Sequence, residues 1–226
     1  MLITIVIPTL NEAACIRRTL SELQSLTPPF ELIVVDGGSV DDTAAIAHPF
    51  ARVVQADRGR AVQMNAGAAV ASGDVLLFLH ADTVLPANAL DLIRGAAENN
   101  ISAGNFRLKF DASSPLLGLY SFFTRFRVSQ FSFGDRGLFV TKTHFEETGG
   151  FAPIPIFEDL DLARRLQKNG PFAYLDAYAT TSARRFRQHG ALRQQLRNAY
   201  LWTRYLLGTS PKQLAHLYPY ASRKTT

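Results

Sequence analysis

The sequence contains a single cysteine, Cys15, among its 226 residues. One cysteine cannot form an intrachain disulfide, and it excludes a zinc site built from several cysteines. The sequence also lacks any apolar run of the about eighteen residues that a membrane-spanning helix needs. Its first ten residues have neither the basic start nor the cleavage site of a secretory signal peptide. These absences predict a cytoplasmic protein, and they assign no role to Cys15.

Acidic side chains are missing from the last fifty residues. Residues 177–226 contain nine Lys and Arg and no Asp or Glu, whereas residues 1–176 contain 15 basic and 19 acidic side chains. The formal net charge of +5 therefore comes from this C-terminal tail. A basic tail suits an anionic partner such as a phosphate-bearing ligand, a membrane surface or a nucleic acid, and a solvated helix face is an equal alternative. Its aromatic residues include Tyr200, Trp202, Tyr205 and Tyr218.

Short β-branched runs alternate with helical patterns in the first half of the chain. This alternation is typical of a largely parallel sheet that is covered by helices on both faces. In such sheets, ligands bind beyond the carboxyl ends of the strands. The expected strands are residues 3–8, 31–35, 52–55 and 74–79, and the expected helices are 11–26, 60–71 and one that starts near Pro86.

The second half mixes strand patterns with aromatic and basic helical segments. A helix is expected at residues 158–169, because acidic residues occupy its first turn and Gly170-Pro171 follows its end. No repeat or linker divides the chain, which predicts one domain over residues 1–226. The other expected elements are strands at 102–110, up to 140 and at 172–180, an aromatic amphipathic segment at 114–130 and a basic helix at 190–207.

Polar clusters follow three of the expected strands. They are Pro8 to Glu12, Asp36 to Ser39 and His80-Ala81-Asp82. Each has a structural alternative, since Asn11 can cap the first helix and Asp36 to Ser39 can form a tight turn that leads to Asp41 or Asp42 as the next cap. Their coincidence at one edge of the sheet favours a binding site.

Four motifs resemble the family two glycosyltransferases with the GT-A fold: IVIPTLNE at 5–12, VVDGGSVDDT at 34–43, GDVLLFLHADT at 73–83 and FEDLDLARRL at 157–166. The strings RGRAVQMNAGA, GGF at 149–151 and TSARRF at 181–186 also resemble a bacterial subgroup labelled arsenosugar-biosynthesis glycosyltransferases. The resemblance implies an α/β, GT-A (nucleotide-diphospho-sugar transferase) fold with a Rossmann-like, mostly parallel sheet. It implies a nucleotide-sugar-binding half at 1–100, an acceptor-binding half at 101–190 and a basic helical tail at 191–226.

The resemblance also implies a donor site. Asp82 matches the carboxylate that binds a divalent metal, Mn²⁺ or Mg²⁺, and such an ion neutralises the diphosphate leaving group. His80 stands where the family usually has Asp, so it is either a second metal ligand or a hydrogen-bond partner of the sugar nucleotide or the backbone. The other residues implied to bind the nucleotide sugar are Pro8, Thr9, Asn11, Glu12, Asp36, Gly37, Arg58, Arg60, Asn65, Ala81, Arg184 and Arg185. Gly67 is expected to permit close helix packing.

Asp159, together with Glu158, matches the position of the catalytic base that deprotonates the acceptor hydroxyl, although Phe157 replaces the usual Thr. The alternative is that both acids only favour the helix N-terminus. Asp135 or Arg136 is implied to touch the acceptor. A single displacement by that hydroxyl would invert the anomeric configuration.

The predicted function is an inverting, metal-assisted glycosyltransferase that uses a nucleotide-diphosphate sugar, most commonly a UDP-sugar, and a small-molecule or lipid-linked acceptor. Processive relatives in the resembled family carry Gln-x-x-Arg-Trp where this sequence has Ser182 to Phe186. The missing Gln and Trp of that motif, together with the missing membrane-spanning helices, argue against a processive polymerase. The alternatives are a sugar-phosphate nucleotidyltransferase, and a peripheral membrane or nucleic-acid binding module with a vestigial site. In the enzyme interpretation no nucleic-acid partner is expected, and the basic tail contacts the inner face of the membrane. The sequence does not specify the sugar or the oligomeric state.

Overall fold

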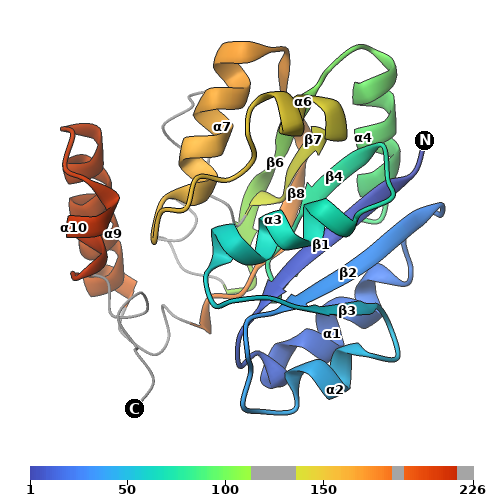
Figure 1. Cartoon of the computed structure of the whole chain (residues 1–226), viewed down its shortest axis with the longest axis horizontal. Coiled ribbons are helices and arrows are strands. Elements are labelled where there is room, and N and C mark those ends of the chain that lie inside the picture. Colours follow the sequence, from blue (N-terminus) through green and yellow to red (C-terminus); the bar gives the residue numbers. More distant parts are fainter. Residues whose placement is uncertain (113–135, 185–190, 218–226) are drawn as a thin grey trace.

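The computed structural model describes residues 1–112, 136–184 and 191–217. They form an eight-stranded sheet with helices on both faces (Figure 1). The strand order is β3-β2-β1-β4-β7-β6-β8-β5. The strands are β1 (Ile3–Thr9), β2 (Phe30–Asp36), β3 (Arg52–Gln55), β4 (Val75–Phe78), β5 (Thr83–Val84), β6 (Ala103–Phe110), β7 (Leu138–Thr141) and β8 (Phe172–Thr181).

The helices agree with the sequence pattern where they are long enough to show a period. The expected boundaries of α3, α7 and α9 lie within one residue of those observed, and the aromatic segment at 114–130 lies outside the described residues. The short α2, α6, α10 and β5 were not expected. The helices are α1 (Ala13–Leu23), α2 (Thr43–Ala47), α3 (Arg60–Val70), α4 (Ala89–Glu98), α6 (Lys142–Glu147), α7 (Glu158–Asn169), α9 (Ala191–Leu206) and α10 (Pro211–Ala215).

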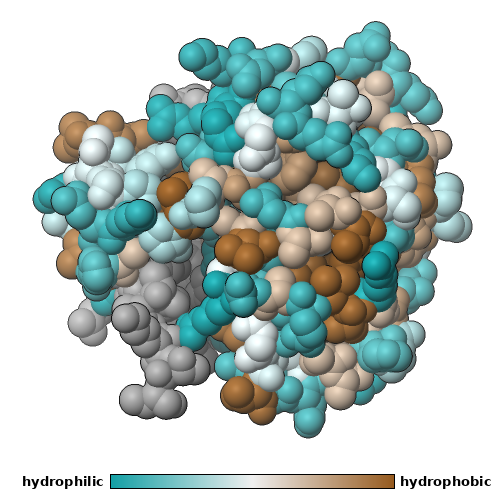
Figure 2. All heavy atoms as spheres, in the orientation of Figure 1, coloured by the Kyte–Doolittle hydropathy of each residue, from teal (hydrophilic) through white to brown (hydrophobic). Residues whose placement is uncertain are grey.

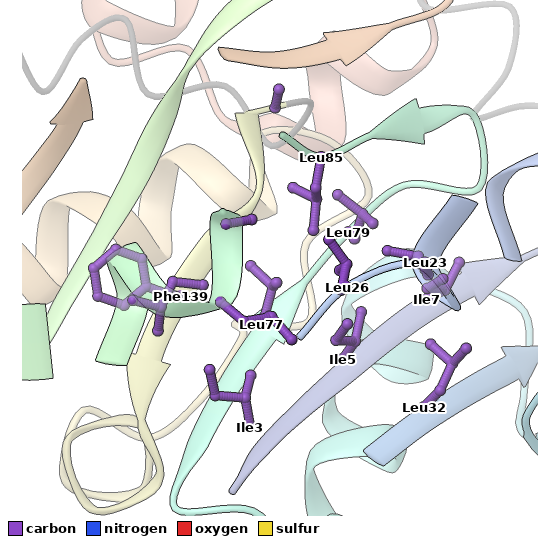
Figure 3. Close-up of a cluster of buried hydrophobic side chains, with 14 of the residues drawn as sticks. Ile3, Ile5, Ile7, Leu23, Leu26, Leu32, Leu77, Leu79, Leu85 and Phe139 are labelled. Atoms are coloured by element: carbon purple, nitrogen blue, oxygen red, sulfur yellow. The ribbon is translucent and has the colours of Figure 1, made fainter. Parts of the chain in front are cut away.

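Strand β1 lies inside the sheet and supplies both faces of the core. Its alternate side chains Ile3, Ile5 and Ile7 are fully buried in one hydrophobic cluster, which Figure 3 shows in close-up. Helices α1 and α4 cover this cluster with residues that include Leu20 and Leu90. Because successive side chains of a strand point to opposite faces, one apolar run can serve two helical layers.

The opposite face of the sheet packs against α3, α6 and α7. Val6 lies in this second cluster with Met64, Phe145 and Leu162 from the three helices. Helix α3 approaches the sheet closely at Gly67, where an added Cβ would lie 2.4 Å from Val6 Cγ1. The expectation that Gly67 permits close helix packing is confirmed.

The sheet is parallel in its first half and mixed in its second. Strands β3, β2, β1 and β4 all run in the same direction, whereas β7 pairs antiparallel with both β4 and β6. Strand β8 runs parallel to β6, and the two-residue β5 pairs antiparallel with the end of β8. That last pairing sets Thr83 opposite Thr181. It thereby brings the end of β8 to the edge where β1, β2 and β4 also end.

Helices α9 and α10 form a separate layer beside α7 (Figure 1). Their buried side chains Leu201 and Leu214 pack on Ile156, and the ring of Tyr205 stacks on Phe157 with centroids 4.7 Å apart. The tail helices therefore pack on the segment that leads into α7. Within the described ranges, we find no helix with both the length and the apolarity to cross a membrane.

Candidate active site

The first polar cluster lies where β1 and β2 end side by side. Thr9 pairs in register with Asp36, and Thr9 Oγ1 lies 3.4 Å from Asp36 Oδ1. Both side chains are buried, while Pro8 is partly exposed one position earlier. The backbone N–H of Gly37 donates to Thr9 O at 2.9 Å, which continues the pairing beyond the strands. The predicted nucleotide residues Pro8, Thr9, Asp36 and Gly37 therefore lie together.

Asp36 forms the tight turn that the sequence allowed. Its Oδ2 accepts hydrogen bonds from the backbone N–H groups of Gly38 at 3.2 Å and Ser39 at 2.9 Å, and its Oδ1 accepts from the Ser39 hydroxyl. Thr9 Oγ1 lies 3.4 Å from the same Oδ1, but it also lies 3.3 Å from Val35 O, and its single proton can go to only one of the two. Three hydrogen bonds from Gly38 and Ser39 thus hold the Asp36 carboxylate in a fixed orientation.

The loop after β1 is joined to the loop after β2. Asn11 has a left-handed backbone with φ of 55°, a conformation that Asn tolerates better than most residues. Its side-chain oxygen accepts from Val40 N at 2.9 Å, so it does not cap α1. The backbone N–H groups at the start of α1 find their acceptors in the loop after β2 instead. Glu12 N donates to Thr43 Oγ1 at 2.8 Å, and Ala13 N donates to Asp41 Oδ2 at 3.2 Å.

Gln63 braces this edge of the sheet and was not predicted. Its amide nitrogen donates to Thr9 O at 2.7 Å and Val35 O at 2.8 Å from a fully buried position on α3. An added Cβ on Gly37 would lie 3.0 Å from the Gln63 amide, which explains a glycine there. The available signal was a polar residue on the otherwise apolar inner face of α3.

The other predicted residues of the α3 region differ in their roles. Arg60 Nη1 lies 3.3 Å from Glu158 Oε1, so it joins the acidic pair, whereas Arg58 is exposed. Asn65 was predicted to reach a diphosphate, but its amide donates to Phe151 O and accepts from Phe151 N, both at 2.9 Å. These contacts brace α3 against the loop at 151, and the role of Asn65 at a diphosphate stays a prediction.

The end of β4 is held from two sides. Thr19 Oγ1 donates to Ala81 O at 2.6 Å, and Ser182 N donates to Asp82 O at 3.2 Å. Ala81 is buried, whereas Asp82 is partly exposed. The carboxylate that was predicted to bind a metal is thus attached to a backbone that is fixed by α1 and by the end of β8.

The acidic pair at the start of α7 lies against this strand end. Asp159 Oδ2 is 3.8 Å from His80 Nε2, and both side chains are about nine-tenths buried. Glu158 is also buried, at 3 % exposure. Burial is the main cause that raises the pKa of Glu158, the neighbouring Asp159 adds to it, and Arg60 opposes it. The pair belongs to the interior of the site and not to a solvated helix end.

Glu12 and Arg184 connect the first and last strands of the site. Arg184 Nη2 donates to Glu12 Oε2 at 2.8 Å, and this hydrogen bond to Glu12 raises the pKa of Arg184. Cys15 Sγ lies 3.1 Å from the same carboxylate oxygen, and burial with the charge of Glu12 raises the pKa of its thiol to about 12. Arg184 therefore joins the predicted cluster.

Two predicted positions, Asp135 and Arg185, lie outside the described residues. Arg136 was predicted to touch the acceptor, but its side chain is completely buried. Its Nε donates to Phe106 O at 2.8 Å, and its guanidinium lies 5.7 Å from the ring centre of Tyr174. This corrects the prediction for Arg136, because the interior holds its charge through a carbonyl and an aromatic face.

The described residues offer few ligands for a metal ion. No three His, Cys, Asp or Glu side chains in that part of the chain gather in a way that could hold an ion. A divalent ion at Asp82 would therefore need most of its ligands from bound phosphate or water. That requirement agrees with the way Mg²⁺ is usually bound, by one or two carboxylates together with substrate phosphates.

Comparison with known families and sequences gives matches over this same region. The family model described as Glycosyl transferase family 2 matches residues 4–153. The PGL/p-HBAD biosynthesis glycosyltransferase of Mycobacterium bovis (strain BCG / Pasteur 1173P2) is 43% identical over 91 residues, which cover 36% of this chain and 36% of that protein. The chain thus aligns with about a third of the length of this curated relative.

Solved structures with the same fold extend over more of the chain. Staphylococcus aureus TarS 1-349 in complex with UDP-GlcNAc has a TM-score of 0.67 at 20% identity, over 80% of this chain and 59% of that one. The mannosyltransferase PcManGT from Pyrobaculum calidifontis, in complex with GDP-Man and Mn²⁺, has a TM-score of 0.68 at 18% identity, over 97% and 69%. These neighbours confirm the predicted GT-A fold class.

Proposed function

Because the chain belongs to glycosyl transferase family 2, we propose that it transfers a sugar from a nucleotide-diphosphate donor to an acceptor hydroxyl, with inversion at the anomeric carbon. The donor is a UDP-sugar in this proposal, and the acceptor is a small molecule or a lipid-linked one. Support for a nucleotide-sugar donor comes from two neighbours, whose structures contain UDP-GlcNAc and GDP-Man.

The observation that carries the proposal is the 3.8 Å distance between Asp159 Oδ2 and His80 Nε2. His80 lies two residues before Asp82 at the end of β4, and Asp159 lies in the first turn of α7. The end of β4, which carries the predicted metal ligand, thus lies against the first turn of α7, which carries the predicted base. An inverting transfer needs this proximity, because the acceptor must attack the carbon from which the diphosphate departs.

Asp159 is the general base in this mechanism. Its carboxylate takes the proton of the acceptor hydroxyl as the oxygen attacks, which requires hydrogen-bond contact with that hydroxyl. Glu158 acts as a positioning residue, because its ion pair with Arg60 ties the start of α7 to α3. Both acids are buried, which limits the bulk water around them.

Asp82 would hold a divalent metal in this mechanism, and the residues present fit such an ion. Asp82 is partly exposed and offers a hard oxygen ligand, and His80 offers an imidazole nitrogen that suits Mn²⁺. The bound ion would neutralise the charge of the departing diphosphate. Mn²⁺ in the PcManGT structure supports this choice of cofactor.

The test is a turnover screen of the purified full chain against UDP-, GDP- and dTDP-sugars with Mn²⁺, Mg²⁺ or EDTA. We expect nucleoside diphosphate to be released from one donor, and the release to be lost with EDTA and in Asp82→Ala. Asp74→Ala is the matched control, since Asp74 lies just before the opposite end of β4 and accepts from Leu2 N on the surface. Full turnover by Asp82→Ala would refute the role of Asp82, and no release from any donor with any acceptor would refute the function.

A further inference from the structure

Helix α9 has two different faces. Its inner face carries Leu201 and Tyr205, which pack on Ile156 and Phe157. The opposite face carries Leu196 and Tyr200. Leu207, the residue after the helix, continues this face because its N–H donates to Thr203 O at 3.0 Å. The three side chains are 63%, 50% and 77% exposed. At 100° per residue, these three positions fall within about 40° of one another around the helix. We call Leu196, Tyr200 and Leu207 the outer stripe.

Exposed apolar side chains concentrate around this stripe. Of the eight large hydrophobic residues that are exposed in the described ranges, five lie between residues 196 and 217. Single exposed hydrophobic residues are ordinary, but a group of them on one small helical layer marks an interaction surface. Figure 2 shows hydrophobic and hydrophilic residues next to one another over α9 and α10.

The charge around the outer stripe has one sign. Arg204 and Lys212 are exposed, Arg197 is partly exposed, and residues 177–226 contain no acidic side chain. Arg204 also lies against Tyr200, with Nη1 3.3 Å from the hydroxyl and the guanidinium 5.9 Å from the ring centre. This contact holds a cation beside an amphipathic ring at the edge of the stripe.

We infer that the outer stripe of α9, with its flanking cations, docks the protein onto an anionic lipid bilayer. A helix that lies in the membrane interface needs an apolar face of leucine and aromatic residues beside basic side chains, and this face of α9 has both. Tyrosine is favoured at that depth because its ring is apolar and its hydroxyl stays hydrated. The inner face stays attached to Ile156 and Phe157, so docking holds the segment before Glu158 near the bilayer.

The structure also limits which aromatic residues of the tail can contact the bilayer. The tail aromatics Tyr200, Trp202, Tyr205 and Tyr218 were considered together from the sequence. Tyr205 stacks on Phe157 and faces the protein, and Tyr218 lies outside the described residues. Tyr200 is the aromatic residue that the described structure presents on the outer stripe.

The experiment is flotation of the full chain with neutral phosphatidylcholine vesicles and with vesicles that contain phosphatidylglycerol, at low and high salt. We expect binding to the anionic vesicles alone, weakened at high salt because the Debye length shortens. Removing one flanking cation, as in Arg204→Gln, should weaken binding about fivefold. The triple variant Leu196→Gln/Tyr200→Gln/Leu207→Gln should weaken it at least about tenfold.

The control is Val40→Gln/Val62→Gln, which makes the same kind of change at two exposed apolar residues away from α9. It should bind vesicles as the unaltered chain does, and circular dichroism should show the same thermal unfolding for all variants. Equal vesicle binding by the triple variant would overturn the inference. So would an absence of vesicle binding, including the case in which the stripe instead mediates self-association or RNA binding. Because no sugar nucleotide is present, this outcome is independent of the proposed reaction.

Discussion

Arg184 Nη2 lies 2.8 Å from Glu12 Oε2, although 172 residues separate the two in the chain. Glu12 follows β1, and Arg184 follows β8. The ion pair therefore closes the candidate site between its first and last strands. About a third of the Arg184 side chain and a fifth of the Glu12 side chain remain exposed.

We expect a small coupling energy between Glu12 and Arg184. A double-mutant cycle with Glu12→Gln and Arg184→Gln should give about 1 kcal/mol or less in urea unfolding, because solvent screens a partly exposed pair. Raising the salt concentration should lower that value. The pair Asp91 and Arg94 on α4, with side chains 55% and 16% exposed, is the reference cycle. A coupling of several kcal/mol that salt does not change would contradict this description of the pair.

Asp159→Asn should lower kcat by about 10²- to 10⁴-fold, because the amide cannot accept the acceptor proton. Asp91→Asn on α4 is the matched control: it also removes a carboxylate from the first turn of a helix, but there the side chain is 55% exposed. Steady-state kinetics with the donor found in the screen would give kcat for both variants. A normal rate in Asp159→Asn would exclude Asp159 as the base.

The stability of the protein should depend on pH through Glu158. Its pKa is raised above the ordinary value of 4.5 in the folded state, mainly by burial and then by Asp159. The folded state therefore holds this proton more tightly than the unfolded state. The stabilisation is complete below about pH 4.5 and is lost as pH rises through the folded pKa. Urea unfolding over this range should show a steeper decline for the unaltered chain than for Glu158→Gln.

The exposed Glu98 on α4 supplies the control for that experiment. Glu98→Gln should keep the pH dependence of the unaltered chain. If the unfolding free energy of Glu158→Gln depends on pH in the same way as that of Glu98→Gln, the buried Glu158 does not cause the pH dependence of stability.

Gly67→Ala should destabilise the fold by about 1–3 kcal/mol, the usual cost of overpacking a core. The added methyl group would lie 2.4 Å from Val6 Cγ1 and 2.9 Å from Val35 Cγ2, so the helix or the sheet must shift. Gly95→Ala on α4 is the matched control, since its added Cβ meets no atom within 4 Å. That variant should gain up to about 1 kcal/mol from helix propensity. Thermal or urea unfolding that ranked the two variants in the opposite order would contradict this packing.

Much of this fold was predictable where the pattern was long or local. The twelve residues of α7 have acids at the start and Gly170 at the end, and both predicted boundaries were correct. The predicted end of α1 was late, because the helix stops at Leu23 before the turns near Pro28. The unexpected helices α2, α6 and α10 have five or six residues, which is less than two turns and too short to show a helical period.

The sheet's second half shows what a strand pattern leaves out. Alternation in residues 102–110 predicts a strand, but it does not give the direction of its neighbour. Strand β7 pairs antiparallel with both β4 and β6, and that choice depends on contacts between distant segments.

The sequence predicted where in the fold the candidate site lies, but not which side chains bond to one another there. The carboxyl ends of parallel strands meet at one edge, so the proximity of Thr9 and Asp36 followed from the order of the elements. The partners of Asn65 and Gln63 did not follow. Asn65 bonds to Phe151, which is 86 residues away, and Gln63 bonds to two strand ends. Each depends on how α3 is rotated against the sheet, which a helical pattern specifies only coarsely.

The thiol of Cys15 lies against Glu12, so its reactivity can report on the ion pair between Glu12 and Arg184. Its pKa of about 12, against an ordinary 9.0, leaves about a thousandfold less of the reactive thiolate at neutral pH. An alkylating reagent therefore reacts slowly while the thiol is buried against Glu12, and faster in any state that exposes it to water. The alkylation rate of this lone cysteine therefore reports how often this edge of the site opens. Mass spectrometry can measure that rate in the unaltered chain.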